Sequence, residues 1–196
     1  TLAVIVDVDS GFFSADFRGA ERVGQLITQV SGRAGRGDKP GTVLLQTHYP
    51  EHPLLRTLIL QGYDTFAKQI LAERMQLNLP PAGYLALIRA ESEHAHDAQQ
   101  WLQRLRVQVD VNWGQTTLSQ KENKKENVVC PQFGAIGPLP APMQRRAGFH
   151  RMQLLLQTTQ RKPLQNLLTE ICRWAEADKA ARKIRWSVDV DPQDML

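Results

Sequence analysis

The chain has 196 residues, a formal net charge of +4 and an apolar share of 42%. This length allows one large domain or two small ones with a real core, and the composition argues against wholesale disorder. No apolar run approaches the roughly 20 residues that cross a bilayer, so we predict no membrane span. The two cysteines, Cys130 and Cys172, and five scattered histidines predict no metal site. Buried free thiols fit a reducing compartment, so we expect a cytoplasmic protein.

The net positive charge of the chain comes from its second part. Basic and acidic residues balance at eight each up to Pro80, and the excess is concentrated between Arg145 and Arg185. Such a lopsided basic surface serves solubility alone or binds nucleic acid or an acidic peptide, and the sequence favours neither.

The first part of the chain predicts alternating strands and helices. Leu2 to Val8 has the pattern of a buried parallel strand, and apolar residues recur at helical spacing from Glu21 to Arg33. A second strand in "KPGTVLLQTH" precedes a short helix that begins at Pro53 and a longer helix over about residues 63–77. Because two strands are too few for a stable sheet of this class, we expect the tail of a larger α/β domain.

The paired prolines of "NLPPAG" predict a domain boundary, with domains at 1–80 and 81–196. Beyond it we predict a strand in "YLALIRAES", a helix over 93–109, and a strand that ends in a proline-rich turn in "QFGAIGPLPAPMQRR". Its hairpin partner in "GFHRMQLLLQTT", a helix over 163–177 and a strand in "KIRWSVDVD" complete the domain. This β-α-β-β-α-β order is the α+β split βαβ, or ferredoxin-like, arrangement.

The stretch "QVSGRAGRG" carries the candidate site. Its glycines follow a helix and precede a strand, which is the reverse of the order in a phosphate-binding loop. One interpretation is a helix that ends in glycine, with arginines that complement its dipole. The other is an arginine finger, because Gln29, Arg33 and Arg36 at i, i+4 and i+7 would project from one face. Gly32 and Gly35 would then leave the adjoining surface open to a γ-phosphoryl group held by other residues.

These residues resemble motif VI of superfamily 2 helicases, with the pattern Gln-x-x-Gly-Arg-x-Gly-Arg. The longer run "DVDSGFFSADFRGAERVGQLITQVSGRAGR" is similar, more narrowly, to the bacterial primosomal replication-restart helicases. The resemblance continues in "HPLLRTLILQGYDTFAKQILAER", "GPLPAP", "RRAGFHRMQLLLQ" and "WSVDVDP". It covers nearly the whole chain and is weakest around residues 107–127.

The resemblance implies a DNA-dependent ATPase that moves 3′ to 5′ along single-stranded DNA and helps to reload the replicative helicase at abandoned forks. It also implies that the first domain is the end of a RecA-like helicase lobe and that the second is S10-like. Arg36 matches the arginine finger, Arg33 the other γ-phosphate arginine, and Gln29 the glutamine that couples nucleotide state to the lobe interface. Arg161 and Gln165 become candidates to contact the acidic tail of single-stranded DNA-binding protein.

The motifs by which the family binds ATP and Mg²⁺ are absent from this chain, as is its cysteine-rich zinc domain. We therefore expect ATP and Mg²⁺ to be held mainly by other residues and the chain alone to be inactive. Zinc is expected in a full-length family member and not in this chain. The resemblance implies forked DNA and other primosome proteins as further partners, and no membrane.

Three further arginines, Arg145, Arg146 and Arg151, flank the predicted hairpin and are candidates to hold DNA phosphates. The alternative is a solvated turn. Asp7 and Asp9 at the end of the first strand are more typical of loop capping than of nucleotide binding. A non-catalytic module that binds single-stranded DNA or an acidic peptide remains the alternative function.

Overall fold

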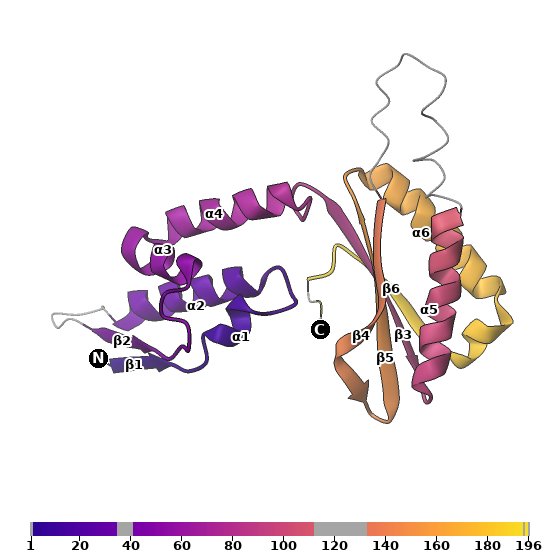
Figure 1. The fold of residues 1–196 in the computed structure, drawn as a ribbon, viewed down its shortest axis with the longest axis horizontal. Coiled ribbons are helices and arrows are strands. Elements are labelled where there is room, and N and C mark those ends of the chain that lie inside the picture. The colour runs from indigo at the N-terminus through magenta and orange to yellow at the C-terminus, as the bar shows by residue number, and fades with distance from the viewer. Residues whose placement is uncertain (1, 35–40, 112–132, 194, 196) are drawn as a thin grey trace, which may run out of the picture. The chain divides into compact units, whose positions relative to one another are not determined.

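The computed structural model describes residues 2–34, 41–111, 133–193 and 195 of the chain (Figure 1). It divides into two compact units, Thr1–Gln76 and Leu77–Leu196, here called the N-terminal and C-terminal units. The paired prolines at which we placed the domain boundary lie just inside the C-terminal unit. None of the described helices is long and apolar enough to span a membrane.

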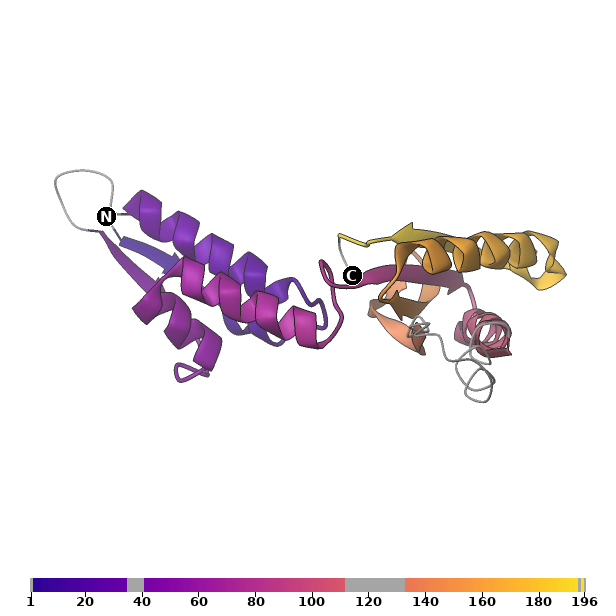
Figure 2. The same ribbon diagram turned by 90° about the horizontal axis from the view of Figure 1, so that it is seen from above.

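The N-terminal unit packs helices against a pair of parallel strands. β1 (Leu2–Ile5) pairs with β2 (Thr42–Leu45), with Ala3 opposite Val43. The helices are α1 (Asp9–Phe12), α2 (Gly19–Ala34), α3 (Pro53–Gln61) and α4 (Tyr63–Gln76). α2 and α4 lie side by side in both views (Figures 1 and 2). The predicted helices and parallel strands are confirmed, and the structure adds the short helix α1 between β1 and α2.

The core of the N-terminal unit consists of apolar side chains from β1, α2, α3 and α4 together with Val8, and residues of α1 and β2 pack against it. Its buried members are Ile5, Val8, Ile27, Leu55, Leu58, Phe66 and Ile70. Among the apolar residues that recur at helical spacing in α2, Ile27 is buried and Val23 and Val30 pack against this core, whereas Leu26 is 46% exposed. Leu26 precedes Ile27 by about 100° around the helix, so it faces away from this core.

The C-terminal unit has the predicted β-α-β-β-α-β order. Its main elements are β3 (Tyr84–Ser92), α5 (Ala95–Val109), β4 (Phe133–Arg146), β5 (Phe149–Thr158), α6 (Arg161–Ala177) and β6 (Arg185–Val190). A short 3-10 helix, η3 (Lys179–Lys183), links α6 to β6. The four strands form an antiparallel sheet in the order β4-β5-β3-β6. Both α5 and α6 cover the same face of that sheet (Figure 1).

The proline-rich run of β4 is a strand, and the prediction of a turn there is wrong. β4 continues to Arg146, with register shifts between Ile136 and Leu139 and again between Pro140 and Arg145. β4 is an edge strand, and an edge strand tolerates proline because one of its sides needs no hydrogen-bond donors. The chain turns later, at Ala147 and Gly148, whose φ angles are 48° and 86°. Two positive φ angles are typical of a type I′ hairpin turn.

The two faces of this sheet differ in chemistry. Residues that lie directly opposite in an antiparallel pair point to the same face. The face under the helices is apolar and contributes Ala86, Ile88, Ala90, Met152, Leu154 and Leu156 to the core. On the opposite face, the end near the β4–β5 turn is polar and is here called the polar face; it carries Arg89, Glu91, Arg151, Gln153, Arg185 and Ser187. The other end of that face carries Leu85 and Leu87, which are completely buried. The end of the polar face beside the β4–β5 turn therefore gathers the charged side chains of Glu91, Arg151 and Arg185.

Candidate functional site

The C-terminal end of α2 brings together the described part of the predicted nucleotide site. Gln29 and Arg33 are four residues apart in α2, so they lie one turn apart on the same face, and both are exposed. A Cβ added at Gly32 would have no heavy atom within 4 Å, so the surface beside Arg33 is open. No ion pair within the described residues involves Arg33. Arg33 is thus available to an anion outside its own helix.

Gly35 and Arg36 lie outside the described residues. Their assignment to the γ-phosphate site stays a prediction, and it depends on the sequence pattern and on the position of Arg33 one residue before the described part of α2 ends.

The packing of α2 fixes the direction in which this end projects. A Cβ at Gly24 would meet Cε1 of Phe66 at 2.2 Å, so only glycine allows α2 to approach α4 this closely. At the other end of α2, the buried Asp16 carboxylate accepts a hydrogen bond from the Arg18 amide at 3.0 Å and pairs with Arg22 at 3.0 Å. α2 is therefore held at its start and near its middle, and these contacts set the direction of the helix that presents Gln29 and Arg33.

The two aspartates after β1 cap loops: Asp7 bonds within its own segment, and Asp9 bonds to the loop after β2. Asp9 accepts hydrogen bonds from the His48 amide at 2.7 Å and from Thr47 Oγ1 at 2.5 Å. These bonds, with the His48 amide foremost, lower the pKa of Asp9. Asp7 accepts a bond from the Ser10 amide at 3.1 Å. The preferred capping interpretation is confirmed, and Asp9 ties the loop after β1 to the loop after β2.

The hairpin arginines occupy two different environments. Arg145 and Arg146 are exposed beside the β4–β5 turn, where no ion pair in the described residues involves them. Arg151 is only 9% exposed. It pairs with Glu91 at 2.9 Å, and its Nη1 donates to the Met143 carbonyl at 3.5 Å. Arg151 is therefore engaged within the sheet, and the DNA-contact hypothesis depends mainly on Arg145 and Arg146.

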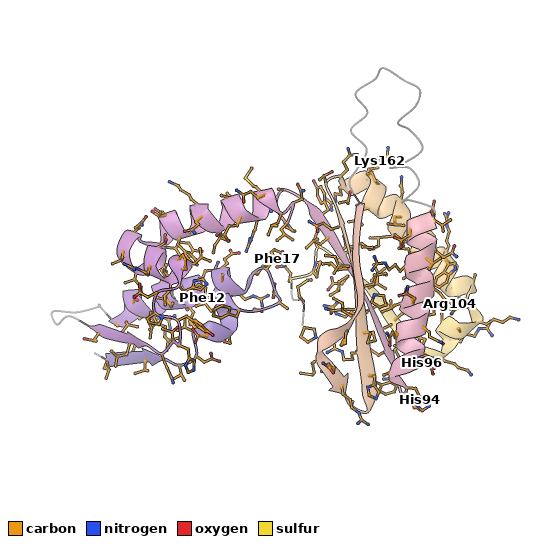
Figure 3. The ribbon with its side chains drawn as sticks, viewed as in Figure 1. Phe12, Phe17, His94, His96, Arg104 and Lys162 are labelled. Carbon is orange, nitrogen blue, oxygen red and sulfur yellow. The ribbon has the colours of Figure 1, made fainter. Side chains whose placement is uncertain are left out.

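The start of α6 presents the predicted partner-binding residues. Arg161 and Gln165 are both exposed and lie one turn apart, while Leu164, Leu167 and Leu168 of the same helix are buried in the core. Lys162 adds a second positive charge there (Figure 3). The geometry thus places a cation and an amide together on the outer side of α6.

The three tryptophans that the structure describes in the C-terminal unit have structural roles. Trp101 is 1% exposed, and its ring lies 5.8 Å from that of Trp174 and 6.0 Å from that of Trp186. Its Nε1 donates to Asp178, which also pairs with Arg104 at 2.7 Å. Trp174 and Trp186 are partly buried and pack against the core cluster. Trp113 lies outside the described residues.

The cysteines and histidines form no metal site within the described ranges, where no group of three or more potential ligands occurs. Cys172 is a free thiol, as predicted, and it is partly rather than fully buried. Burial and the neighbouring Glu176 raise the pKa of Cys172. Cys130 lies outside the described residues.

Two residues that the sequence analysis did not single out occupy the hairpin end of the polar face. The guanidinium carbon of Arg185 lies 4.0 Å from the ring centroid of Phe149. The alternation of polar residues in "RWSVDV" signals that one face of β6 is solvated. The alternation does not show which residue lies beside Arg185, because the neighbour of Arg185 is determined by how β3 pairs with β5 and with β6.

A family model described as the primosomal protein N C-terminal domain matches residues 75–193. The chain belongs to this family. The match begins at the end of α4 and includes the whole β-α-β-β-α-β unit.

Curated relatives match the N-terminal unit as well. The chain is 44% identical over its full length to a replication restart protein PriA of Haemophilus influenzae and 30% identical over its full length to one of Bacillus subtilis. A relative of the same name from Synechocystis is 36% identical over 80% of the chain. The chain spans only 24%, 22% and 17% of these three relatives, respectively. Among solved structures, a designed protein aligns with 57% of the chain and all but 1% of its own length, at 11% identity and a TM-score of 0.34.

Proposed function

We propose that this chain is the C-terminal part of an ATP-dependent 3′ to 5′ DNA helicase that acts in replication restart and primosome assembly at stalled forks. Family membership and relatives named replication restart protein support this proposal. In this account the N-terminal unit is the end of a RecA-like lobe, and the C-terminal unit is an S10-like domain that binds DNA and partner proteins.

The observation that carries the proposal is the exposed position of Arg33, without an acidic partner among the described residues, on a helix held by the Gly24–Phe66 contact. We assign Arg36 as the arginine finger, Arg33 as the second γ-phosphate arginine and Gln29 as the residue that couples nucleotide state to the lobe interface. A guanidinium binds two phosphoryl oxygens at once and stabilises the charge of the transition state. Gly32 and Gly35 keep the approach open to the nucleotide.

The residues of this chain do not suffice to hold a nucleotide. ATP and Mg²⁺ are proposed to be bound mainly by an opposing lobe, and zinc by a separate domain of the longer protein. What the chain supplies is positive charge that meets the γ-phosphate when the lobes close. Removing the finger should lower turnover far more than it weakens ATP binding, because its interaction is strongest in the transition state.

The proposed partners of the C-terminal unit are single-stranded and forked DNA, the acidic tail of single-stranded DNA-binding protein and other primosome proteins. Arg161 and Gln165 suit the tail, since a guanidinium pairs with carboxylates and an amide bonds to the peptide backbone. Arg145 and Arg146 suit DNA phosphates, because both are exposed and unpaired among the described residues.

The test is DNA-stimulated ATPase activity of Arg36→Ala and Arg33→Ala in a full-length protein that contains this chain together with the nucleotide-binding motifs. We expect a loss on the order of 10³-fold or more for Arg36→Ala, with nucleotide binding largely retained. Gln25→Ala, on an exposed position of the same helix, is the matched control and should keep normal turnover. Unchanged turnover of Arg36→Ala would refute the assignment.

A further inference from the structure

The end of the polar face beside the β4–β5 turn places an aromatic ring between two arginines. Arg146 lies directly opposite Phe149 across the hairpin. Glu91 in β3 lies opposite both Arg151 in β5 and Arg185 in β6. Phe149 and Arg151 are two residues apart in β5, so they point to the same face. Arg146, Phe149 and Arg185 therefore share the polar face.

The contact of Arg185 with Phe149 spans the width of β3. The guanidinium carbon lies 4.0 Å from the ring centroid, which is within the range of a cation–π contact. Arg185 is exposed and Phe149 is half-buried, so the pair forms a planar, positively charged platform at the surface. An arginine already packed against an aromatic ring loses little further side-chain entropy when it binds a ligand.

The positive charge of this platform is not cancelled within the described residues. Glu91, the acidic side chain in register with Arg185, is bound by Arg151 at 2.9 Å. Lys183, at the end of η3, is exposed and precedes Arg185 by two residues. No ion pair in the described part of the chain involves Arg146, Lys183 or Arg185. Because Arg151 already neutralises Glu91, the other three cations remain available to bind an anionic ligand.

We propose that these four residues, Arg146, Phe149, Lys183 and Arg185, form a binding surface for single-stranded nucleic acid, here called the hairpin-end surface. A base stacks on the Arg185–Phe149 platform while Arg146 and Lys183 contact the adjoining phosphates. This inference rests on the proposed DNA-dependent function and specifies where the strand binds. The sheet face with an aromatic side chain is a known platform for unpaired bases, and arginine planes also stack on bases.

The Arg185–Phe149 platform favours single-stranded nucleic acid over an acidic peptide as the ligand of this surface. Carboxylates need cations with free hydrogen-bond donors, which Arg161 and Lys162 at the start of α6 offer without an aromatic ring. Lys162 lies at the opposite end of the unit from His94, which follows the hairpin end of β3 (Figure 3). The two surfaces can therefore be changed separately.

The experiment measures binding of a fluorescent oligothymidylate to the 196-residue chain, without nucleotide, by anisotropy between 50 and 200 mM salt. We expect Arg146→Ala and Lys183→Ala each to weaken binding at least about threefold and to reduce the salt slope by about 0.7, the value for one phosphate contact on a single strand. Arg185→Lys keeps the charge but loses the planar stack, so its affinity should fall while its slope stays. Phe149→Leu should behave as Arg185→Lys does.

Lys162→Ala is the matched control, since it removes one exposed charge from the far end of the same unit. Its effect should be less than about twofold. An equal loss with Lys162→Ala, or no loss with the four variants, would overturn the proposal. So would displacement of the oligonucleotide by an equimolar acidic peptide. The assay contains no nucleotide, so its failure leaves the assignment of Arg33 and Arg36 intact, and a failed ATPase test leaves this surface intact.

Discussion

The ring of Phe66 in α4 lies so close to Gly24 in α2 that a Cβ at position 24 would be 2.2 Å from Cε1. Phe66 is completely buried, so the ring has no room to move away. This contact positions the helix that carries Gln29 and Arg33, and it links the core of the N-terminal unit to the candidate site.

Gly24→Ala should destabilise the N-terminal unit by about 1–3 kcal/mol, because overpacking forces α2 away from α4. The measurement is chemical denaturation of the chain followed by circular dichroism. Gly32→Ala is the control in the same helix, where the new methyl group meets nothing within 4 Å. It should be neutral or stabilising by up to about 1 kcal/mol. Equal effects of the two substitutions would contradict the packing argument.

Arg151→Ala should destabilise the C-terminal unit by about 1–3 kcal/mol, because it leaves Glu91 partly buried without its partner. The double variant Arg151→Ala, Glu91→Ala should recover part of that loss, as expected for a coupled pair. Thermal unfolding of the single and double variants provides the measurement. A surface arginine would show neither the loss nor the recovery.

Asp178 should make the C-terminal unit sensitive to acid. Burial opposes ionisation of Asp178, but the Ala180 amide, the Arg104 guanidinium and the Trp101 indole outweigh it, so its pKa is lowered. A lowered folded-state pKa stabilises the fold above the unfolded value of about 3.9, and this contribution is lost as the pH falls through the folded value. Asp178→Asn should therefore lower stability at pH 7 and flatten the dependence of stability on pH below about 4. Tryptophan fluorescence of the chain during denaturation, measured as a function of pH, follows the change, and an unaltered pH profile would contradict it.

Ala147→Asn should stabilise the β4–β5 hairpin by about 0.4–1 kcal/mol. Ala147 has a φ of 48°, in a region that asparagine tolerates better than alanine. Gly148 has a φ of 86°, so Gly148→Ala should be destabilising although nothing lies within 4 Å of the added methyl group. The melting temperature of each variant, compared with that of the unsubstituted chain, tests the expected rise for Ala147→Asn and the expected fall for Gly148→Ala. A rise with Gly148→Ala would show that the turn is not left-handed at both positions.

Local patterns in the sequence predicted much of the fold. The helical spacing from Glu21 to Arg33, the proline at the start of α3 and the alternation in β6 each act within one element, so each could be read from neighbouring residues. The turn in β4 was mispredicted because proline is tolerated at a sheet edge, and edge position is a property of the whole sheet.

The same limit applies to the candidate site. Features that lie within one element could be predicted from the sequence, and features that depend on contacts between elements could not. Gln29 and Arg33 share a face because the helical period dictates it. The internal role of Arg151 and the platform made by Phe149 and Arg185 depend on strand register between segments far apart in the sequence. Burial and charge pairing across strands could not be inferred from composition, which shows only that positive charge accumulates after Pro80.

The central claim is that the arginines at the end of α2 act on the γ-phosphate in the transition state. The most direct test compares the affinities of a full-length protein containing this chain for ADP with aluminium fluoride and for ADP alone, before and after Arg33→Ala and Arg36→Ala. The account predicts that both substitutions weaken binding of the transition-state analogue by at least about tenfold and leave ADP affinity nearly unchanged. Equal affinity of the wild-type and substituted proteins for the analogue would contradict it.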